Sequence, residues 1–516
     1  MRNLAMLRIL ILFAVVVPLA VYIGYLLANP YNSRSMGEIG LAILFLLSPL
    51  LLKDHHFLPF MFWNATLNLW FIPGSPPLWL LFSVLSVGLI FLSGSLHRRN
   101  VLLPVPSVGA PLVYLGAVIV VTMQLTGGVS TEAMGGDKFG GKGYMLLLGA
   151  ITGFFALSSH QIPLSRAKWY VAIFFLSGLT AAVSDVILGL GQPFYFLYSF
   201  FSPEVAMYQA EGELGFGQIV RLGGAALAGQ SVCNFLIAKF GIRGLVDFRH
   251  PWRPLLFLLC FGIALLGGFR SSFIAIVLLV CAQFVFEKLL RTAIFPATIM
   301  ATFLLAICVL PFVNRLPLAV QRSLSILPVQ VDPAAALDAE GTSEWRWEMW
   351  KAVLPDVPKY LFLGKGYLFN STDMYLTQEA ARRGYASEFD SMIVVGGYHN
   401  GPLTTIIPFG IWGALGFLWF CWTSIRYLYR KKEQGRPELK NINTFLLSLF
   451  CSSLLFFLTI YGQFNLDLRI FAGIMGFSIA LNRGAENLKL SPPALRQSRV
   501  APAPPLRKPL PDLRPA

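Results

Sequence analysis

Charged residues are scarce in this sequence. Only 13% of its 516 residues are Asp, Glu, Lys or Arg, whereas 56% are hydrophobic, and the mean hydropathy is +0.66. Soluble globular domains carry about 25% charged residues, so this composition excludes an ordinary soluble enzyme. Repeated apolar runs of spanning length are instead typical of a chain that crosses a membrane several times.

Acidic residues are fewer than basic ones, 25 against 40, which gives a formal net charge of +15. A basic surplus can indicate nucleic-acid binding when it is gathered on one face. In this chain the basic residues lie in short loops between apolar segments, which is the positive-inside pattern of membrane proteins. We therefore expect the protein to lie in a lipid bilayer and to bind no nucleic acid.

Metal-binding patterns are missing from the sequence as well. Its six Cys all lie in apolar segments and none has the spacing of metal ligands, so neither a disulfide framework nor a zinc site is predicted. No paired-carboxylate or His/Asp motif is present that would suit a harder metal. We expect no metal and no cofactor.

About fourteen apolar segments run from residues 7–27 to residues 470–482, and several are short for a membrane span. The first follows Arg2 and Arg8 and has features of a signal peptide, but its length and the later spans favour an uncleaved helix. For segments 38–52 and 57–73, a re-entrant pair is an alternative. The sequence predicts an all-α polytopic membrane protein with about 12–14 transmembrane helices.

The distribution of Lys and Arg predicts the orientation. Cytoplasmic termini place most short basic loops inside, including the cluster at residues 426–432. Four regions follow from this threading: a helical bundle over 1–312, an extracytoplasmic (periplasmic) loop domain over 313–400, C-terminal transmembrane helices over 401–482, and a basic, Pro-rich cytoplasmic tail over 483–516. We expect the tail to be disordered. Helical patterns near 344–350 and 370–383 predict that the long loop folds as a cap on the bundle.

Five ionisable residues reach the outer face on this threading: Arg221, Arg270, Arg346, His399 and Asp467. Each has a structural alternative. An Arg at a helix end can extend to lipid headgroups, and Arg346, flanked by two Trp, can lie against an aromatic ring. A lone His is often structural, and Asp467 can pair with Arg469.

The combination of these residues favours chemistry. Guanidinium groups bind phosphate oxygens in a bidentate fork and keep their charge near neutral pH. An imidazole can take a proton from an attacking hydroxyl group near neutral pH. Two Arg and one His therefore suit a reaction in which a pyrophosphate group leaves beside a hydroxyl nucleophile, with the Arg charge in place of a divalent metal.

Three motifs in the second half of the chain match a known pattern. His399-Asn400, nine residues, Gly410, two residues and Gly413 resemble the signature of the O-antigen ligase family. Arg346-Trp347-Glu348-Met349-Trp350, with Pro358 and the turn Gly364-Lys365-Gly366, is similar to the family's Arg-x-x-x-Trp motif and the turn that follows it. Arg270-Ser271-Ser272-Phe273-Ile274 resembles its membrane Arg-x-x-x-Leu motif, with Ile in place of Leu. The resemblance covers about residues 254–482.

This resemblance implies a helical membrane glycosyltransferase with a GT-C-like bundle. Such enzymes move a glycan from undecaprenyl pyrophosphate to an acceptor hydroxyl at the outer face of the bacterial cytoplasmic membrane, in lipopolysaccharide and other polysaccharide biosynthesis. Carried over by position, His399 would be the general base, and Arg270 and Arg346 would hold the pyrophosphate. Arg221 is a further candidate for that role, and Asp467 and Asn400 are possible supporting residues.

The sequence leaves several functions open. An O-antigen ligase, a polysaccharide polymerase and a protein glycosyltransferase share the donor chemistry, and the acceptor depends on loop shape. We favour the ligase-like enzyme, with an O-antigen or exopolysaccharide polymerase as the alternative. From another class, a glycolipid flippase or transporter would carry ionisable groups in the middle of its spans, where Asp185 is nearly the only candidate. A structural scaffold would leave the outer Arg and His unexplained.

Overall fold

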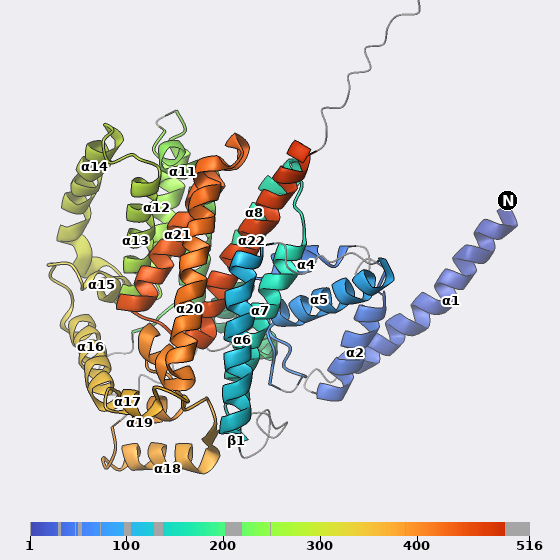
Figure 1. Cartoon of the computed structure of the whole chain (residues 1–516), viewed down its shortest axis with the longest axis horizontal. Coiled ribbons are helices and arrows are strands. Elements are labelled where there is room, and N and C mark those ends of the chain that lie inside the picture. The colour runs from blue at the N-terminus through green and yellow to red at the C-terminus, as the bar shows by residue number, and fades with distance from the viewer. Residues whose placement is uncertain are drawn as a thin grey trace, which may run out of the picture.

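The computed structural model describes ten stretches of the chain: residues 2–28, 32–46, 48–49, 54–72, 74–97, 105–127, 138–201, 219–247, 249–387 and 389–490. Its architecture is all-α, with helices that cross the molecule side by side and a group of shorter helices at one end (Figure 1). The tail predicted to be disordered begins at residue 483, but residues 483–490 continue the last helix, Phe464–Leu490, and the rest of the tail lies outside the described residues.

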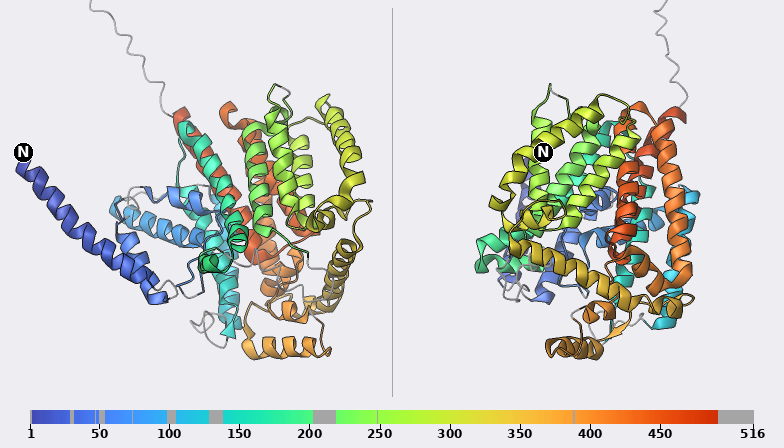
Figure 2. Two further views of the ribbon diagram at one scale, coloured as in Figure 1. Left: turned by 180° about the vertical axis from the view of Figure 1, so that it is seen from behind. Right: turned by 90° about the vertical axis from the view of Figure 1, so that its left-hand side faces the viewer.

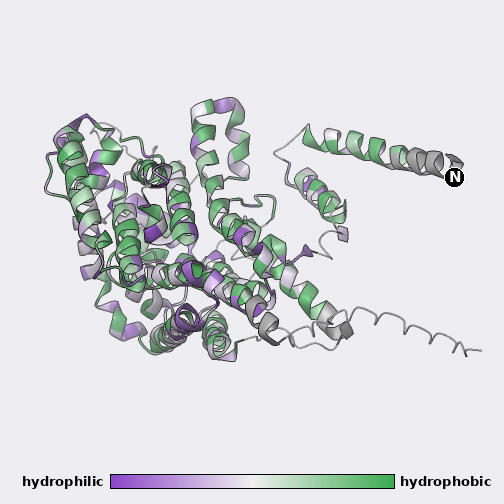
Figure 3. Ribbon diagram, turned by 90° about the horizontal axis from the view of Figure 1, so that it is seen from above, coloured by the Kyte–Doolittle hydropathy of each residue, from purple (hydrophilic) through white to green (hydrophobic). Residues whose placement is uncertain are grey.

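Eight helical segments in the described residues are long and apolar enough to cross a membrane: Pro106–Thr126, Gly141–Ser159, Leu164–Leu190, Gly223–Leu245, Ile294–Arg315, Gly401–Gln434, Pro437–Thr459 and Phe464–Arg483. Four shorter apolar helices accompany them: Val16–Leu27, Leu78–Leu92, Trp252–Leu265 and Arg270–Phe286. Viewed from above, apolar residues cover most of these ribbons (Figure 3). The fold is therefore the all-α polytopic membrane protein that the composition predicts.

The N-terminal third begins with α1 (Arg2–Leu27), α2 (Ser33–Leu46), α4 (Phe57–Phe62) and α5 (Leu78–His97). Helices α1 and α2 project away from the other helices, as two opposite views show (Figures 1 and 2). The apolar segment 57–73 is not a continuous helix. It forms the six-residue α4 and then an extended stretch, in which Leu67 pairs with Phe201 and Asn68 with Pro77.

The main bundle contains the remaining long helices: α6 (Pro106–Thr126), α7 (Gly141–Ser159), α8 (Ala167–Leu176), α9 (Ala182–Leu190), α11 (Gly223–Leu245), α12 (Trp252–Leu265), α13 (Arg270–Phe286), α14 (Ile294–Val309), α20 (Gly401–Gln434), α21 (Lys440–Thr459) and α22 (Phe464–Leu490). At the centre, α7 and α22 approach closely because small residues line their contact with the core. A Cβ atom on Gly473 would lie 1.9 Å from Nε1 of Trp63, and one on Gly476 would lie 2.8 Å from Cβ of Leu157.

Between α14 and α20 the chain forms α15 (Leu318–Leu324), α16 (Pro333–Val353), α17 (Asp356–Tyr360), α18 (Ser371–Arg382) and α19 (Asp390–Val394). The last four gather at one end of the bundle, at the bottom of Figure 1. The helical patterns near 344–350 and 370–383 are confirmed as parts of α16 and α18. A two-residue strand, β2 (Phe369–Asn370), pairs antiparallel with β1 (Lys138–Phe139) and links this group to the loop before α7.

Helix α16 is docked on α20 by a small apolar cluster. Met349 and Val353 of α16 are buried together with Leu403 and Ile407, which lie in the first two turns of α20. Trp350 adds a hydrogen bond from Nε1 to the carbonyl of Tyr398, at 2.8 Å. This contact places the C-terminal end of α16 beside the residues immediately before α20.

Candidate functional site

His399 lies at the start of α20, where the backbone turns sharply. Its φ angle is +52°, in the left-handed region that non-glycine residues rarely adopt. The next residue, Asn400, is the N-cap of α20, and its side chain accepts a hydrogen bond from the backbone N–H of Leu403 at 3.1 Å. Asn400 thus has a structural role that accounts for its presence: it fixes the helix start and the orientation of His399.

The imidazole of His399 is held between two aromatic rings. Its ring centroid lies 5.6 Å from that of Trp345 and 5.1 Å from that of Tyr461, both in edge-on arrangements. Its Nδ1 atom is buried and has no hydrogen-bond partner. A buried polar atom without a protein partner is unusual, and contact with a ligand or a reacting group is one explanation for it.

Burial, and secondarily the charge of Arg346, lowers the pKa of His399 from its ordinary value to about 4. Both effects act in the same direction, because desolvation and a neighbouring cation each disfavour imidazolium. The ring is therefore neutral at neutral pH and keeps a lone pair that can accept a proton.

Arg346 lies on α16 beside the same ring of Tyr461, with its guanidinium carbon 5.5 Å from the ring centroid. Its Nε atom is buried and has no hydrogen-bond partner. Burial lowers the pKa of Arg346 from its usual value, but a guanidinium group remains charged in proteins. His399 and Arg346, which are far apart in the sequence, thus share one aromatic neighbour.

Arg270 begins α13 and reaches α16 one to two turns before Arg346. Its Nη2 atom donates hydrogen bonds to the carbonyl of Ala339 at 2.5 Å and to Oγ of Ser343 at 2.8 Å. Arg221, just before α11, forms an ion pair with Asp338 of α16, with Nη2 and Oδ2 2.6 Å apart. Arg221 and Arg270, both predicted to lie at the outer face, therefore contact α16, and Arg221 has a carboxylate partner there.

Arg322 was not predicted from the sequence, yet it is the most buried arginine of the group, with 3% of its surface exposed. From α15 it donates to the carboxylate of Asp338 and to the carbonyl of Gly268. Its Nη2 atom also bonds Oγ1 of Thr342 at 2.9 Å. No motif surrounds Arg322 in the sequence, because its partners come from distant elements.

Four arginines, Arg221, Arg270, Arg322 and Arg346, gather positive charge along α16. Among the described contacts, Asp338 is the acidic partner that two of the four share. Burial has the largest effect on the pKa of Arg346 and lowers it; Tyr461 opposes this effect, and repulsion from Arg322 adds to it, which indicates that the two guanidinium groups lie close enough to repel each other. Partly buried guanidinium groups of this kind suit an anionic ligand with several oxygens, such as a phosphate or pyrophosphate.

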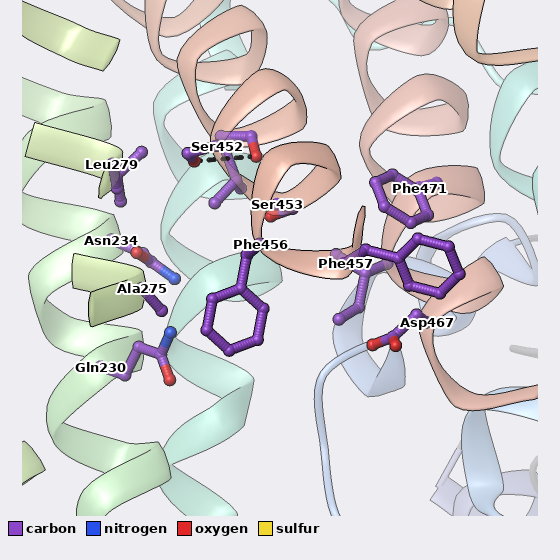
Figure 4. Close-up of a pocket in the computed structure, with 12 residues that line it drawn as sticks. Gln230, Asn234, Ala275, Leu279, Ser452, Ser453, Phe456, Phe457, Asp467 and Phe471 are labelled. Atoms are coloured by element: carbon purple, nitrogen blue, oxygen red, sulfur yellow. Dashed lines mark hydrogen bonds between the residues drawn. The ribbon is translucent and has the colours of Figure 1, made fainter. Parts of the chain in front are cut away.

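Asp467 lies apart from this cluster, in the first turn of α22. Its Oδ2 atom accepts a hydrogen bond from the backbone N–H of Gln463 at 2.7 Å. The guanidinium carbon of Arg469 lies 5.4 Å from the ring centroid of Trp79. The carboxylate lines a cavity of about 130 Å³ between α11, α13, α21 and α22 (Figure 4).

This cavity has both polar and aromatic walls. Its polar lining residues are Gln230, Asn234, Ser452, Ser453 and Asp467, and Phe456, Phe457 and Phe471 line it as well (Figure 4). The Phe456 ring also contacts Tyr461, with 6.5 Å between centroids. Asp467 therefore faces a chamber next to the His399 site, separated from it by aromatic side chains.

Tyr461 and Trp345 are two site residues that sequence reasoning did not identify as such. Tyr461 precedes Gly462 in the short connection between α21 and α22, and its neighbours give no local motif. Among the described residues, no group of three or more His, Cys, Asp or Glu side chains is arranged to hold a metal ion. The candidate site is thus built from guanidinium groups, one neutral imidazole and aromatic rings.

Comparison with known protein families identifies a match to part of the chain. The O-antigen ligase family model matches residues 255–418, a stretch that runs from α12 into α20 and contains Arg270, Arg322, Arg346 and His399. A search of curated proteins finds no match to the chain. The family carries out glycosyl transfer, and together with eight apolar helices it indicates a bacterial membrane protein that uses a lipid-linked glycan and an acceptor. The match over residues 255–418 supports the assignment of this chain to the O-antigen ligase family.

Proposed function

We propose that this protein transfers a glycan from undecaprenyl pyrophosphate to an acceptor hydroxyl group, in the manner of an O-antigen ligase. The observation that carries the proposal is the neutral imidazole of His399, with a buried Nδ1 atom that has no partner, beside the guanidinium group of Arg346. A proton acceptor next to fixed positive charge is what this substitution at a sugar carbon requires.

In the proposed reaction, the acceptor oxygen attacks the anomeric carbon of the donor glycan. The bond from that carbon to the pyrophosphate oxygen breaks, and the pyrophosphate leaves with the polyprenyl chain. His399 takes the proton of the acceptor hydroxyl, so that no alkoxide has to form in advance. Arg346 and Arg270 stabilise the negative charge that develops on the leaving group.

The four arginines divide into two roles in this proposal. Arg346 has an unpartnered Nε atom and contacts the same Tyr461 ring as His399, so it is the best placed to hold the pyrophosphate. Arg270 lies near Arg346, and its Nη2 atom donates a hydrogen bond to the carbonyl of Ala339 on α16. Arg221 and Arg322 share Asp338, which favours a supporting role in which they hold α16 in place.

The proposal includes the orientation and the regions expected from the sequence. The termini are cytoplasmic, and α16–α19 lie in the periplasm, within an extracytoplasmic domain of residues 313–400 between the bundle of 1–312 and the C-terminal helices of 401–482. A polymerase that transfers the same donor to a growing polysaccharide is the alternative within the family, because the acceptor is set by loop shape.

A transporter would use a different feature, namely a polar path through the bundle. The cavity beside α21 is a partly polar space within the bundle, but Asp467 is the single ionisable residue in its lining. That residue lies in the first turn of α22, near one end of the span. The cavity therefore gives weaker support for a transporter than the imidazole and guanidinium groups give for a glycosyltransferase.

The test is a reaction of the purified protein in vesicles with a defined undecaprenyl-pyrophosphate-linked glycan and a saccharide acceptor. We expect equal amounts of glycosylated acceptor and free undecaprenyl pyrophosphate, and the same rate in EDTA, because the arginines supply the positive charge. Loss of transfer in EDTA with recovery in magnesium would contradict the arginine role. Movement of donor across the vesicle membrane without transfer to any acceptor would show that the protein is a transporter and not a glycosyltransferase.

A further inference from the structure

The second half of α16, α17 and the loop that follows expose several large apolar side chains. Trp347 is 58% exposed, Leu354 54%, Phe362 68% and Leu363 71%. Scattered apolar residues on a surface need no explanation, but four within one short segment indicate an interaction surface. The partner of this surface can be inferred from its position on α20.

The loop after α17 crosses α20 at the kink of that helix. The backbone N–H of Ile411 donates to the carbonyl of Leu361 at 2.6 Å, and that of Lys365 donates to the carbonyl of Ile407 at 2.7 Å. The close approach needs a glycine, because Gly410 has a φ angle of +64° and its Cβ would lie 2.6 Å from the Leu361 carbonyl oxygen. Phe362 and Leu363 are therefore fixed beside residues 407–411 of α20.

Helix geometry gives the depth of that position. From Gly401 onward, α20 contains no charged residue before Arg426, which begins a basic cluster. A hydrocarbon layer of about 30 Å corresponds to about 20 helical residues. Counted back from Arg426, the layer ends near residue 406, so residues 407–411 lie at its outer edge. Phe362 and Leu363 consequently lie at the level where acyl chains meet headgroups.

The exposed surface of α20 continues from this point along the helix. Trp412 is 50% exposed, Leu415 48% and Trp419 46%. These side chains belong to a candidate membrane span and face outward from it. The apolar side chains of the loop, Phe362 and Leu363, thus continue the lipid-facing surface of α20 toward the headgroups.

Positive charge accompanies the apolar residues. The segment 347–365 contains Lys351, Lys359 and Lys365 against Glu348 and Asp356, three positive charges against two negative ones. The ammonium group of Lys351 lies 5.4 Å from the Trp347 ring centroid, and that of Lys359 lies 4.9 Å from the Tyr360 ring centroid. Aromatic rings with lysines beside them are typical of the membrane interface, where the lysine stem lies along apolar surface and the ammonium group reaches lipid phosphates.

We propose that residues 347–365 form a docking surface for anionic phospholipid, in which Phe362 and Leu363 enter the upper acyl layer and the three lysines contact headgroup phosphates. Because Arg346 lies on the same helix as Trp347, this contact sets the height of the candidate active site above the acyl layer. The inference rests on α20 as a membrane span and does not depend on the proposed glycan transfer.

The test measures how well the bilayer protects a cysteine placed on this surface. Leu363→Cys and, as a matched control, Tyr385→Cys are reconstituted in phosphatidylglycerol vesicles and treated with a neutral, membrane-impermeant polyethylene-glycol maleimide. Tyr385 follows α18 and is 85% exposed. The unsubstituted protein gives the background from its own six Cys. We expect Leu363→Cys to react at least tenfold more slowly than Tyr385→Cys.

Two further measurements decide the chemistry of the partner. Protection of Leu363→Cys should be several-fold weaker in phosphatidylcholine vesicles, and Lys351→Gln with Lys359→Gln should remove the difference between the two lipids. Equal labelling of Leu363→Cys and Tyr385→Cys in phosphatidylglycerol would overturn the docking surface. Equal protection in both lipids would overturn the role of anionic headgroups.

Discussion

At the scale of single residues, the surroundings of His399 decide what it can do. An imidazole in water is half protonated near pH 6.5, and the sequence alone predicts a loss of activity below that pH. In the folded protein, burial and the neighbouring Arg346 lower the pKa of His399 to about 4. The neutral, proton-accepting form therefore persists well into the acid range.

This shift gives a specific pH dependence for transfer. The rate should be constant from about pH 8 down to about pH 5 and should fall only as the pH approaches 4, because protonation then removes the base. Single-turnover transfer measured across this range, with unfolding followed in the same samples, checks the prediction. A midpoint near 6.5 in folded protein would mean that His399 is more accessible to water than its contacts indicate.

Arg346 should not tolerate replacement by lysine. Arg346→Lys keeps the charge but loses the planar fork that fits two phosphate oxygens, so we expect transfer to fall by about a hundredfold or more, the scale of one preorganised donor. The matched control is Arg383→Lys, just after α18, where the exposed Arg383 pairs with Glu379. Equal activity of both variants would assign Arg346 to an aromatic contact at the interface.

At the scale of elements, α16 is held by three arginines from three different parts of the chain. Arg221, Arg270 and Arg322 contact a face of α16 formed by Asp338, Ala339, Thr342 and Ser343. Arg346 follows on the same helix, so these contacts and the packing of Met349 on α20 fix where its guanidinium group lies.

Removal of Asp338 should loosen α16. Asp338→Ala leaves the buried Arg322 and the partly buried Arg221 without their shared carboxylate. Breaking a fully buried ion pair costs about 3–5 kcal/mol, and because Asp338 is 39% exposed we expect about 1–3 kcal/mol here. Thermal unfolding should show the loss, and Glu340→Ala, two residues further along α16, should not. Unchanged stability of Asp338→Ala would contradict the supporting role.

The packing of α22 against Trp63, the residue that follows α4, depends on glycine. Gly473→Ala would place a methyl group 1.9 Å from Nε1 of Trp63, and overpacking of this kind costs about 1–3 kcal/mol. Gly262→Ala on α12 is the control, because nothing lies within 4 Å of the added Cβ. A lower unfolding temperature for Gly473→Ala, with Gly262→Ala unchanged or slightly raised, is the expected result. Equal unfolding temperatures would show that Trp63 moves away at no cost.

The same elements show what the sequence could and could not predict. Arg270, Arg346 and His399 carry local motifs, and their family match was predictable from those residues. Arg322, Trp345 and Tyr461 belong to the site through contacts between distant elements, which no local pattern reports. Segment 57–73 looked like a span because composition alone cannot distinguish a helix from an apolar extended stretch.

At the scale of the whole molecule, the account depends on which side of the membrane holds α16–α19. The basic cluster at residues 426–432 and the long loop at residues 313–400 lie at opposite ends of α20. The positive-inside pattern places the cluster in the cytoplasm and the loop outside. A topology reporter inserted after Asp338 should be active outside, and one inserted after Lys432 should be active inside. A cytoplasmic signal at Asp338 would place His399 and Arg346 away from a periplasmic acceptor.

The measurement that tests the central claim most directly separates donor binding from transfer in His399→Ala. The variant and the wild type are reconstituted in equal amounts, and binding of the undecaprenyl-pyrophosphate donor and single-turnover transfer are measured on the same samples. His250→Ala, whose exposed ring pairs with Asp247, serves as the control. We predict that His399→Ala binds the donor as the wild type does and transfers at least about a hundredfold more slowly. Transfer by His399→Ala at the wild-type rate would show that this residue is structural and would contradict the mechanism.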